Sequence, residues 1–260
     1  MAIRIKTQEE IDKMRQAGRI VRKVLEHLER IIRPGMTTEE LDNQADAMIV
    51  SLGGKALFRG VPNPKAGYPF PACICVSIDD EVVHGIPSNE RVLEEGQIVS
   101  IDCGVRYAGY CGDAAATFAV GQVSDAKRKL MSVTKRTLEI AIENIKPGVR
   151  WSKIAAKMQA YVEKNGFSVV TDFVGHGIGK DMHEDPKIPN FVSNELLRND
   201  IVLEPGMVLA VEPMVNMGTS SVRYGTDGWT ILTADNLPSA HFEHSIAVTR
   251  DGASVLTDGS

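Results

Sequence analysis

The amino-acid sequence predicts an α+β fold whose two related halves share a curved, mostly antiparallel sheet with helices on its outer face. An internal repeat carries this prediction. Residues 32–53 match residues 145–166 at a constant offset of 113, and each stretch begins with an Ile-Arg-Pro-Gly or Ile-Lys-Pro-Gly sequence. Residues 92–102 match 202–212 at an offset of 110, and each ends in an apolar strand followed by an acid. A repeated helix-helix-strand unit implies a pseudo-twofold arrangement.

Helical periodicity and capping residues place two helices in each half. Thr7 can cap the first helix, and Thr37 or Thr38 can cap the second. A Pro-Gly pair stops the first helix of each half, because proline and glycine disfavour further helical turns. The expected helices span about 7–32, 37–53, 124–145 and 152–164.

Composition limits the domain count, the partners and the compartment. With 260 residues, 43% of them hydrophobic, the chain can bury a substantial core. We therefore expect a single domain, 1–260, with halves of about 1–123 and 124–260. The net charge of −5 favours a small molecule or peptide over nucleic acid or an anionic membrane. No apolar run reaches the length of a signal peptide or membrane span, so we expect a cytoplasmic protein. Reduced thiols are then expected at Cys73, Cys75, Cys103 and Cys111.

Two aspartates in adjacent apolar strands form the first candidate site. Asp102 ends one apolar run, and Asp113 precedes another. A hairpin that closes about Tyr107 and Ala108 would place the two carboxylates directly opposite each other, whereas a bulge at Gly109 would shift the pairing by one residue. Carboxylates that face each other in apolar surroundings repel. A shared proton, a basic side chain or a metal ion must then neutralise them, unless both acids are solvated.

Three further ionisable residues stand where side chains are expected to point inward. Glu212 ends an apolar strand, Glu243 lies in the first strand of a C-terminal hairpin, and His176 lies in a Gly-His-Gly-Ile-Gly sequence. Each alone could be a solvated residue. Four carboxylates and one imidazole, however, are costly to bury together without a cation. Two divalent ions would balance the charge, and this donor set suits Mn, Fe, Co or Zn with a bridging water or hydroxide as nucleophile.

Separate motifs extend this candidate site over nearly the whole chain. They are Glu81-Val82-Val83-His84-Gly85-Ile86-Pro87, Asp102 with Asp113, Gly175-His176-Gly177-Ile178-Gly179, His183-Glu184, Val211-Glu212-Pro213-Met214, Asp227-Gly228-Trp229 and Phe242-Glu243-His244. In this order and spacing, the sequence resembles the type I methionine aminopeptidases. The resemblance implies the pita-bread fold of that family. It also implies removal of the initiator methionine from nascent proteins with a small second residue, by attack of a metal-bridged water on the first peptide bond.

The resemblance implies a role for each acid. Asp102 and Asp113 would chelate one of two divalent metal ions. Asp113 and Glu243 would form a bridged pair with the metals, and His176 and Glu212 would complete the ligand set. Glu212 would also act as general base, taking a proton from the bridging water and delivering it to the leaving amine.

Two further histidines match family residues that flank the metals without being permanent ligands. His183 would hydrogen-bond the scissile carbonyl oxygen as it gains charge. His84 would contact the scissile amide nitrogen or the backbone of the next residue. Ordinary loop histidines are the alternative for both positions.

The resemblance also implies an apolar pocket for the methionine side chain. Met182 stands where relatives often carry an aromatic residue, and a flexible Met there could still pack on a substrate thioether. The segment 67–75 is longer than in close relatives. Simple core packing is the alternative for the whole set. The implied pocket residues are Tyr68, Phe70, Cys75, Met182 and Trp229.

Two other functions compete with this one. An X-Pro dipeptidase or aminopeptidase P of the same fold would usually add an N-terminal domain, and the His-Gly-Ile-Pro context favours methionine. A non-catalytic binding module would have lost its ligand residues, all of which are present here. We expect a monomer whose partner is the N-terminal methionine of nascent peptides, without nucleic acid or membrane partners; a transient contact with the ribosome stays open.

Overall fold

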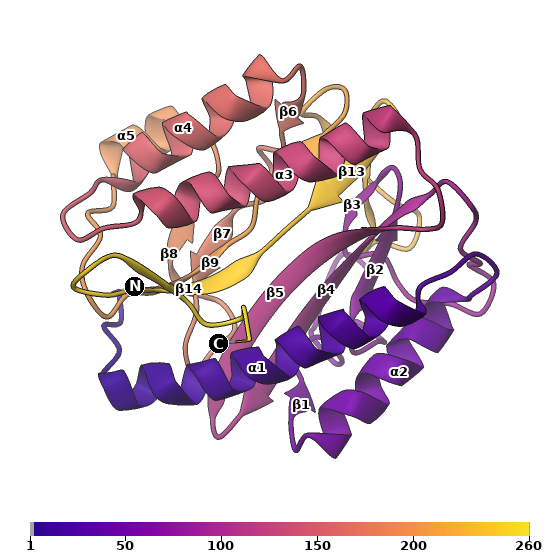
Figure 1. Ribbon diagram of the computed structural model, residues 1–260, viewed down its shortest axis with the longest axis horizontal. Helices are drawn as coiled ribbons and strands as arrows, with labels where there is room; N and C mark the ends of the chain where they lie inside the picture. Colours follow the sequence, from indigo (N-terminus) through magenta and orange to yellow (C-terminus); the bar gives the residue numbers. More distant parts are fainter. Residues whose placement is uncertain (1–2, 260) are drawn as a thin grey trace.

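The computed structural model describes residues 3–259, in which two helix pairs pack on antiparallel strands. The helices are α1 (Gln8–Ile31), α2 (Thr38–Ser51), α3 (Asp125–Asn144), α4 (Trp151–Lys164) and the short α5 (Asn194–Arg198). Figure 1 shows α1 and α2 along one half of the molecule and α3 and α4 along the other, with the strands β5 (Tyr110–Ala119) and β14 (His244–Val248) between them. This is the layered arrangement that the repeat predicts.

The strands form four small sheets, and every ladder among the described residues is antiparallel. One sheet has the order β1 (Lys55–Ala56), β4 (Ile98–Tyr107), β2 (Cys75–Ile78), with β5 also paired to β4. Another has the order β15 (Ala253–Val255), β14, β9 (Val208–Val211), β7 (Gly175–Gly177), β8 (Glu184–Ile188). A third sheet has the order β13 (Ser239–His241), β10 (Met214–Asn216), β6 (Ser168–Val169). The fourth has the order β11 (Val222–Tyr224), β12 (Ile231–Thr233), β3 (Glu81–Val83).

The internal repeat has a structural counterpart in the turn that follows the first helix of each half. The Gly35 amide donates to Leu93 O at 2.8 Å, and the equivalent Gly148 amide donates to Leu203 O at 2.8 Å. Both glycines have positive φ, 84° and 80°, a conformation that glycine adopts without steric cost. The pseudo-twofold arrangement is therefore present in the backbone, whereas a division of the chain near residue 123 stays a prediction.

Three of the four long helices begin where their capping residues predict. Thr7 and Thr37 each form a capping box with the glutamate three residues on, which settles the choice between Thr37 and Thr38. Ser124 accepts from the Lys127 amide and caps α3. The helix α4 begins at Trp151, one residue earlier than expected, and has no side-chain cap.

The central hairpin has a different register from the predicted one. Its turn consists of Ala108 and Gly109, both with positive φ, and Tyr107 pairs with Tyr110. A two-residue turn with positive φ at both positions matches the twist of the strands, which explains why the hairpin closes here. The predicted direct opposition of the two aspartates is therefore wrong, and so is the one-residue shift. Instead, Asp102 pairs with Ala115 and Asp113 with Gly104, so the aspartates share a face diagonally.

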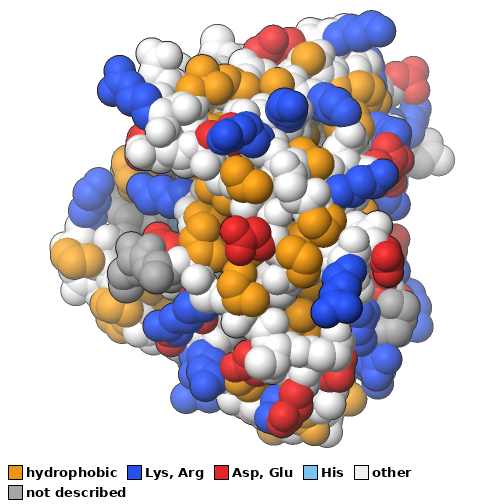
Figure 2. Space-filling model, turned by 90° about the vertical axis from the view of Figure 1, so that its left-hand side faces the viewer, with side chains coloured by type: hydrophobic (Ala, Val, Ile, Leu, Met, Phe, Trp, Pro, Cys, Tyr) orange, Lys and Arg blue, Asp and Glu red, His pale blue; other side chains and the backbone are white. Residues whose placement is uncertain are grey.

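The core consists mainly of two hydrophobic clusters, one in each half. The first packs α1 and α2 on the β4–β5 hairpin, and the second packs α3 and α4 on the sheet that contains β9 and β14. The four cysteines are buried and free, as expected. Figure 2 shows one face of the molecule, on which Lys and Arg side chains alternate with Asp and Glu around scattered hydrophobic residues. Within residues 3–259, no helix has both the length and the apolar character needed to cross a membrane.

Candidate active site

The predicted site residues meet in one cavity of about 160 Å³. It lies where the β4–β5 hairpin from the first half meets strands from the second. All four predicted carboxylates, the three predicted histidines and four of the five predicted pocket residues line it. The lining residues are Phe58, Val61, Phe70, Cys75, His84, Asp102, Asp113, His176, Met182, His183, Glu212, Trp229 and Glu243.

Breaks between strands place two of the acids. Pro213 has no amide proton, and Glu212 lies between the end of β9 and the start of β10, which belongs to another sheet. Glu243 lies between β13 and β14, and its amide donates to Ala115 O at 2.9 Å. Both side chains are thus freed from a ladder at the point where the sheets of the two halves meet.

A reciprocal pair of hydrogen bonds ties β5 to β14 beside Asp113. The Asp113 amide donates to Ser245 Oγ at 3.0 Å, and the Ser245 hydroxyl donates to Asp113 O at 2.8 Å. Because the contact uses backbone groups on one side, the Asp113 carboxylate stays available to the cavity. This contact fixes the distance between the acids of the first half and Glu243.

Three ligand atoms of the site lie close enough to hold a metal ion. One donor atom from each of Asp113, His176 and Glu243 lies within 4.8 Å of the others. The Nδ1 atom of His176 lies 2.9 Å from Gly177 O, which favours a proton on Nδ1. The electron pair of Nε2 is then free to bind a metal ion. That Nε2 atom is 3.6 Å from Glu212 Oε1. The imidazole is therefore oriented for a ligand between these acids.

The carboxylates of the site have buried oxygen atoms without a hydrogen-bond partner among the described residues. These atoms are Asp102 Oδ1, Asp113 Oδ1 and Glu243 Oε1. Burial raises the pKa of Asp113 to about 7. Burial, and then repulsion from the neighbouring carboxylates, also raises the pKa values of Asp102, Glu212 and Glu243 well above their usual range. Acids of this kind need a proton or a cation, and divalent metal ions fit the oxygen-rich donor set.

The histidines of the site are neutral at pH 7. Burial, and then the nearby His183, lowers the pKa values of His84 and His176 to about 4. Burial also lowers the pKa of His183. The rings of His176 and His183 meet edge to face with centroids 4.5 Å apart. Neutral imidazoles can ligate a metal or donate one hydrogen bond, which are the two roles that the sequence predicts for them.

A strained backbone holds His84 in place. Its φ is 62°, which is uncommon for a residue other than glycine. The next residue, Gly85, approaches Val76 so closely that a Cβ would lie 2.2 Å from the Val76 carbonyl oxygen. The imidazole also meets the rings of Phe173 and Trp229 at centroid distances of 5.8 and 6.3 Å. Backbone strain at a ring that lines a cavity is typical of functional sites.

Aromatic residues form the apolar wall of the cavity. Phe70 and Trp229 meet edge to face at 5.1 Å, and the indole nitrogen donates to Tyr68 O at 3.2 Å. The Tyr68 side chain itself does not line the cavity, contrary to expectation. It is 40% exposed, and its hydroxyl donates to Asp227 O at 2.8 Å, which directs the ring outward.

The cavity also contains residues that the sequence did not single out. Phe58 and Val61 line it, and the signal for them was the Gly-, Pro- and aromatic-rich composition of residues 58–71, which is typical of loops that line sites. His241 is buried beside the cavity, with its Nε2 atom 4.0 Å from Glu212 Oε2. In the sequence, His241 could have been found from its position two residues before Glu243, since residues at this spacing share one face of a strand.

Sequence comparison identifies a family model over most of the chain. The model of metallopeptidase family M24 matches residues 12–250. The methionine aminopeptidase 1 of Bacillus subtilis is 46% identical over 253 residues, 97% of this chain and 98% of the relative. The methionine aminopeptidase of Escherichia coli K12 is 41% identical over 258 residues, 99% of this chain and 94% of the relative. The residues that the family model matches span every site residue named above.

Solved structures confirm the fold class. The methionine aminopeptidase of Thermotoga maritima has a TM-score of 0.92 and 42% identity, and the alignment covers 98% of this chain and 99% of that one. An Xaa-Pro dipeptidase from Bacillus anthracis has a lower TM-score, 0.75, with 27% identity over 98% of this chain but only 62% of that one. The chain therefore belongs to metallopeptidase family M24 and, within it, to the methionine aminopeptidases.

Proposed function

We propose that the protein removes the N-terminal methionine from peptides and nascent proteins whose second residue is small. One observation carries the proposal. A single cavity is lined both by the four carboxylates and His176, which fit divalent metal ions, and by the apolar side chains of Phe70, Met182 and Trp229. Metal-assisted hydrolysis and recognition of an apolar side chain can therefore occur side by side. The relatives at 41–46% identity carry the name of this activity.

We propose Asp102, Asp113, His176, Glu212 and Glu243 as ligands of two divalent metal ions. Bound there, the ions would supply Lewis-acid polarisation and a water of lowered pKa. The four carboxylate charges balance two divalent ions, which removes the cost of burying the acids together.

Glu212 is the proposed general base. Its carboxylate lines the cavity, with Oε1 3.6 Å from His176 Nε2. In its ionised form it can accept a proton from the attacking water and pass it to the leaving amine. His183 lines the same cavity as a neutral imidazole and can donate to the scissile carbonyl oxygen as charge develops there. His84, held by its backbone and by Trp229, can contact the scissile amide nitrogen.

The methionine side chain is proposed to pack on Phe70, Met182 and Trp229. The thioether of a substrate methionine makes favourable contacts with aromatic ring edges and with the polarisable Met182 side chain. Phe58 and Val61 add apolar surface to the same wall. We do not include Tyr68 in this wall, because it is not among the residues that line the cavity.

Hydrolysis of paired peptides tests the proposed function. Protein loaded with Mn²⁺ or Co²⁺ should cleave Met-Ala-X peptides and leave X-Pro peptides intact. Substitution of the second residue by a bulky one should abolish cleavage. Cleavage of the X-Pro peptide alone would contradict the proposed function and show that the protein is a proline-specific peptidase of the same fold.

The proposed substrate also indicates the compartment in which the protein acts. Nascent chains are made in the cytoplasm, so we propose that the protein acts there and meets its substrate transiently near the ribosome. All the proposed metal ligands come from one copy of the chain, so the site needs no residue of a second copy to be complete, and we propose a monomer. Sedimentation velocity of the purified protein checks this, since a dimer would appear at twice the mass.

A further inference from the structure

The loop between β7 and β8 carries two cavity residues, and a buried carboxylate holds it. Met182 and His183 end this loop, and Glu184 begins β8. The Glu184 Oε1 atom accepts from the amides of Lys180 at 3.0 Å and Asp181 at 3.3 Å. The loop is also held at its start, where the Gly179 amide donates to Asp181 O at 3.1 Å and the Cys111 amide donates to Gly179 O at 2.8 Å. The Glu184 contacts extend this support to the two residues that lie just before Met182 and His183.

An N-terminal lysine neutralises this carboxylate inside the protein. Lys6 Nζ donates to Glu184 Oε2 at 2.9 Å, and the two side chains are only 6% and 4% exposed. The fit around the pair is tight, since a Cβ at Gly179 would lie 2.6 Å from Glu184 and 2.8 Å from the Lys6 stem. A buried ion pair of this kind depends on both partners, because loss of one leaves an uncompensated charge.

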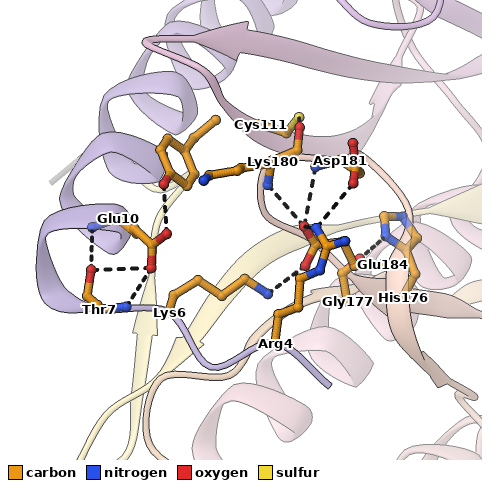
Figure 3. A network of polar contacts seen from close by, with 11 residues as sticks. Arg4, Lys6, Thr7, Glu10, Cys111, His176, Gly177, Lys180, Asp181 and Glu184 are labelled. Atoms are coloured by element: carbon orange, nitrogen blue, oxygen red, sulfur yellow. Dashed lines mark hydrogen bonds and ion pairs between the residues drawn. The ribbon is translucent and has the colours of Figure 1, made fainter. Parts of the chain in front are cut away.

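The backbone of Lys6 is fixed independently of its side chain. Its amide donates to Gly206 O at 2.8 Å, in the turn that leads into β9 and on to Glu212. The next residue, Thr7, caps α1. Figure 3 shows Lys6 reaching from the start of α1 to Glu184, beside His176 of β7. One lysine therefore connects α1, the turn before β9 and the loop that carries His183.

Arg4 contacts the same loop but differs in exposure. Its Nη1 atom lies 3.3 Å from Glu184 Oε1 and 3.2 Å from Asp181 Oδ2, while its side chain is 57% exposed. Ion pairs of exposed side chains contribute little. The chain thus offers a matched pair of cations, one buried and one exposed, on a single carboxylate.

We propose that Lys6 and Glu184 are positioning residues for His183: through the loop backbone they hold the imidazole where it can donate to the scissile carbonyl oxygen. The role assigned to His183 rests on the proposed function. Such a donor must be placed before charge develops, so its displacement lowers kcat and leaves KM nearly unchanged.

The substitution Lys6→Met tests the proposal, with Arg4→Met as the matched control. We expect Lys6→Met to lower kcat for a Met-Ala peptide by about tenfold, with KM within about twofold of wild type, and Arg4→Met to change neither. In a His183→Ala background, Lys6→Met should change kcat less than about twofold, because the two substitutions act on the same interaction, the hydrogen bond from His183 to the scissile carbonyl oxygen. A kcat for folded Lys6→Met within about twofold of wild type would overturn the proposal, and so would an equal loss in both backgrounds.

Hydrogen exchange gives a readout that needs neither substrate nor metal. The amides of Lys180 and Asp181 should exchange faster in Lys6→Met than in wild type or Arg4→Met. Unchanged exchange would overturn the link between Lys6 and the loop. If the wild type cleaves no Met-Ala peptide, the proposed function fails, while the exchange result still decides whether Lys6 holds the loop.

A double variant covers the case in which Lys6→Met does not fold. Lys6→Met with Glu184→Met buries no unpaired charge, so it should fold, and it also removes the oxygen that accepts from the Lys180 and Asp181 amides. The same loss of kcat with nearly unchanged KM is expected of it. Wild-type kcat in this double variant would overturn the proposal.

Discussion

At the scale of single residues, Glu212 has the most sharply defined expected role. We predict that Glu212→Gln lowers kcat by about 10²–10⁴-fold, because an amide cannot accept the proton that a general base removes. Steady-state kinetics with a Met-Ala peptide, together with metal titration by calorimetry, checks this. Near-normal turnover with the wild-type number of bound metals would contradict the assignment.

The ionisable residues of the site could be predicted from the sequence, whereas the apolar ones could be predicted only in part. An acid such as Asp113 within apolar runs stands out, because burial of its charge demands compensation. Phe58 is one apolar residue among many, and its place in the wall depends on a loop path. Tyr68 was misplaced for the same reason: Asn63 holds that loop through its amide contacts to the Lys65 backbone and to Gly228 O.

The ion pair of Lys6 and Glu184 could not be predicted from the sequence either. The two residues are far apart in the chain, and single charged residues are usually solvated. The contact arises only because the start of α1 lies against the loop before β8. Long-range polar pairs of this kind require the tertiary structure.

At the scale of elements, the close approach of α1 to the C-terminal segment controls stability. A Cβ at Gly18 would lie 2.1 Å from the backbone oxygen of Leu256, and neither backbone can yield easily. We predict that Gly18→Ala lowers the free energy of unfolding by about 1–3 kcal/mol, the usual range for overpacking.

Urea denaturation measures this effect, with Gln16→Ala on the exposed face of the same helix as control. The control should unfold at or slightly above the wild-type midpoint, since alanine favours helix. If Gly18→Ala is as stable as Gln16→Ala, the close approach is not a constraint in solution.

Elements were predictable where their signals are local. The caps at Thr7 and Thr37 and the periodic apolar residues defined the helices to within a residue or two. The hairpin register was not predictable, because the first turn residue, Ala108, adopts positive φ although it is not a glycine. Cys103 and Cys111 still lie in different hydrophobic clusters, since a shift of two residues keeps each side chain on its face.

At the scale of the whole molecule, metal-free protein should lose stability as the pH rises. The pKa of Asp113 is raised by burial from 3.8 to about 7, so between these values the folded state binds more protons than the unfolded state. The contribution of Asp113 to the free energy of unfolding therefore falls with rising pH in this range. Above about pH 6.5 the unfolded histidines are also neutral, so the carboxylates dominate the slope.

The comparison of wild type with Asp113→Asn isolates this effect. In metal-free protein, the stability of the variant relative to wild type should rise between pH 6 and 8, by at most about 1.4 kcal/mol per pH unit. Thermal unfolding across this range measures the difference. Added Mn²⁺ should stabilise wild type and remove its pH dependence. A difference that is constant with pH would show that the carboxyl is ionised in the folded state throughout.

The overall arrangement followed from the repeat, but the sheet organisation did not. A single curved sheet was expected, whereas the hydrogen-bond ladders divide into four, because breaks such as the one at Pro213 end pairing. Those same breaks free Glu212 and Glu243 for the cavity. Two of the proposed metal ligands therefore lie where the regular sheet is interrupted.

The tie between Asp113 and Ser245 has a consequence for biosynthesis. A ribosome releases the first half of the chain, with Asp102 and Asp113, long before it releases β14. Until Ser245 and Glu243 have left the exit tunnel, the early acids have neither their strand partner nor the remaining carboxylate. The proposed metal site is therefore completed among the last steps of synthesis, and shortened translation products lack it.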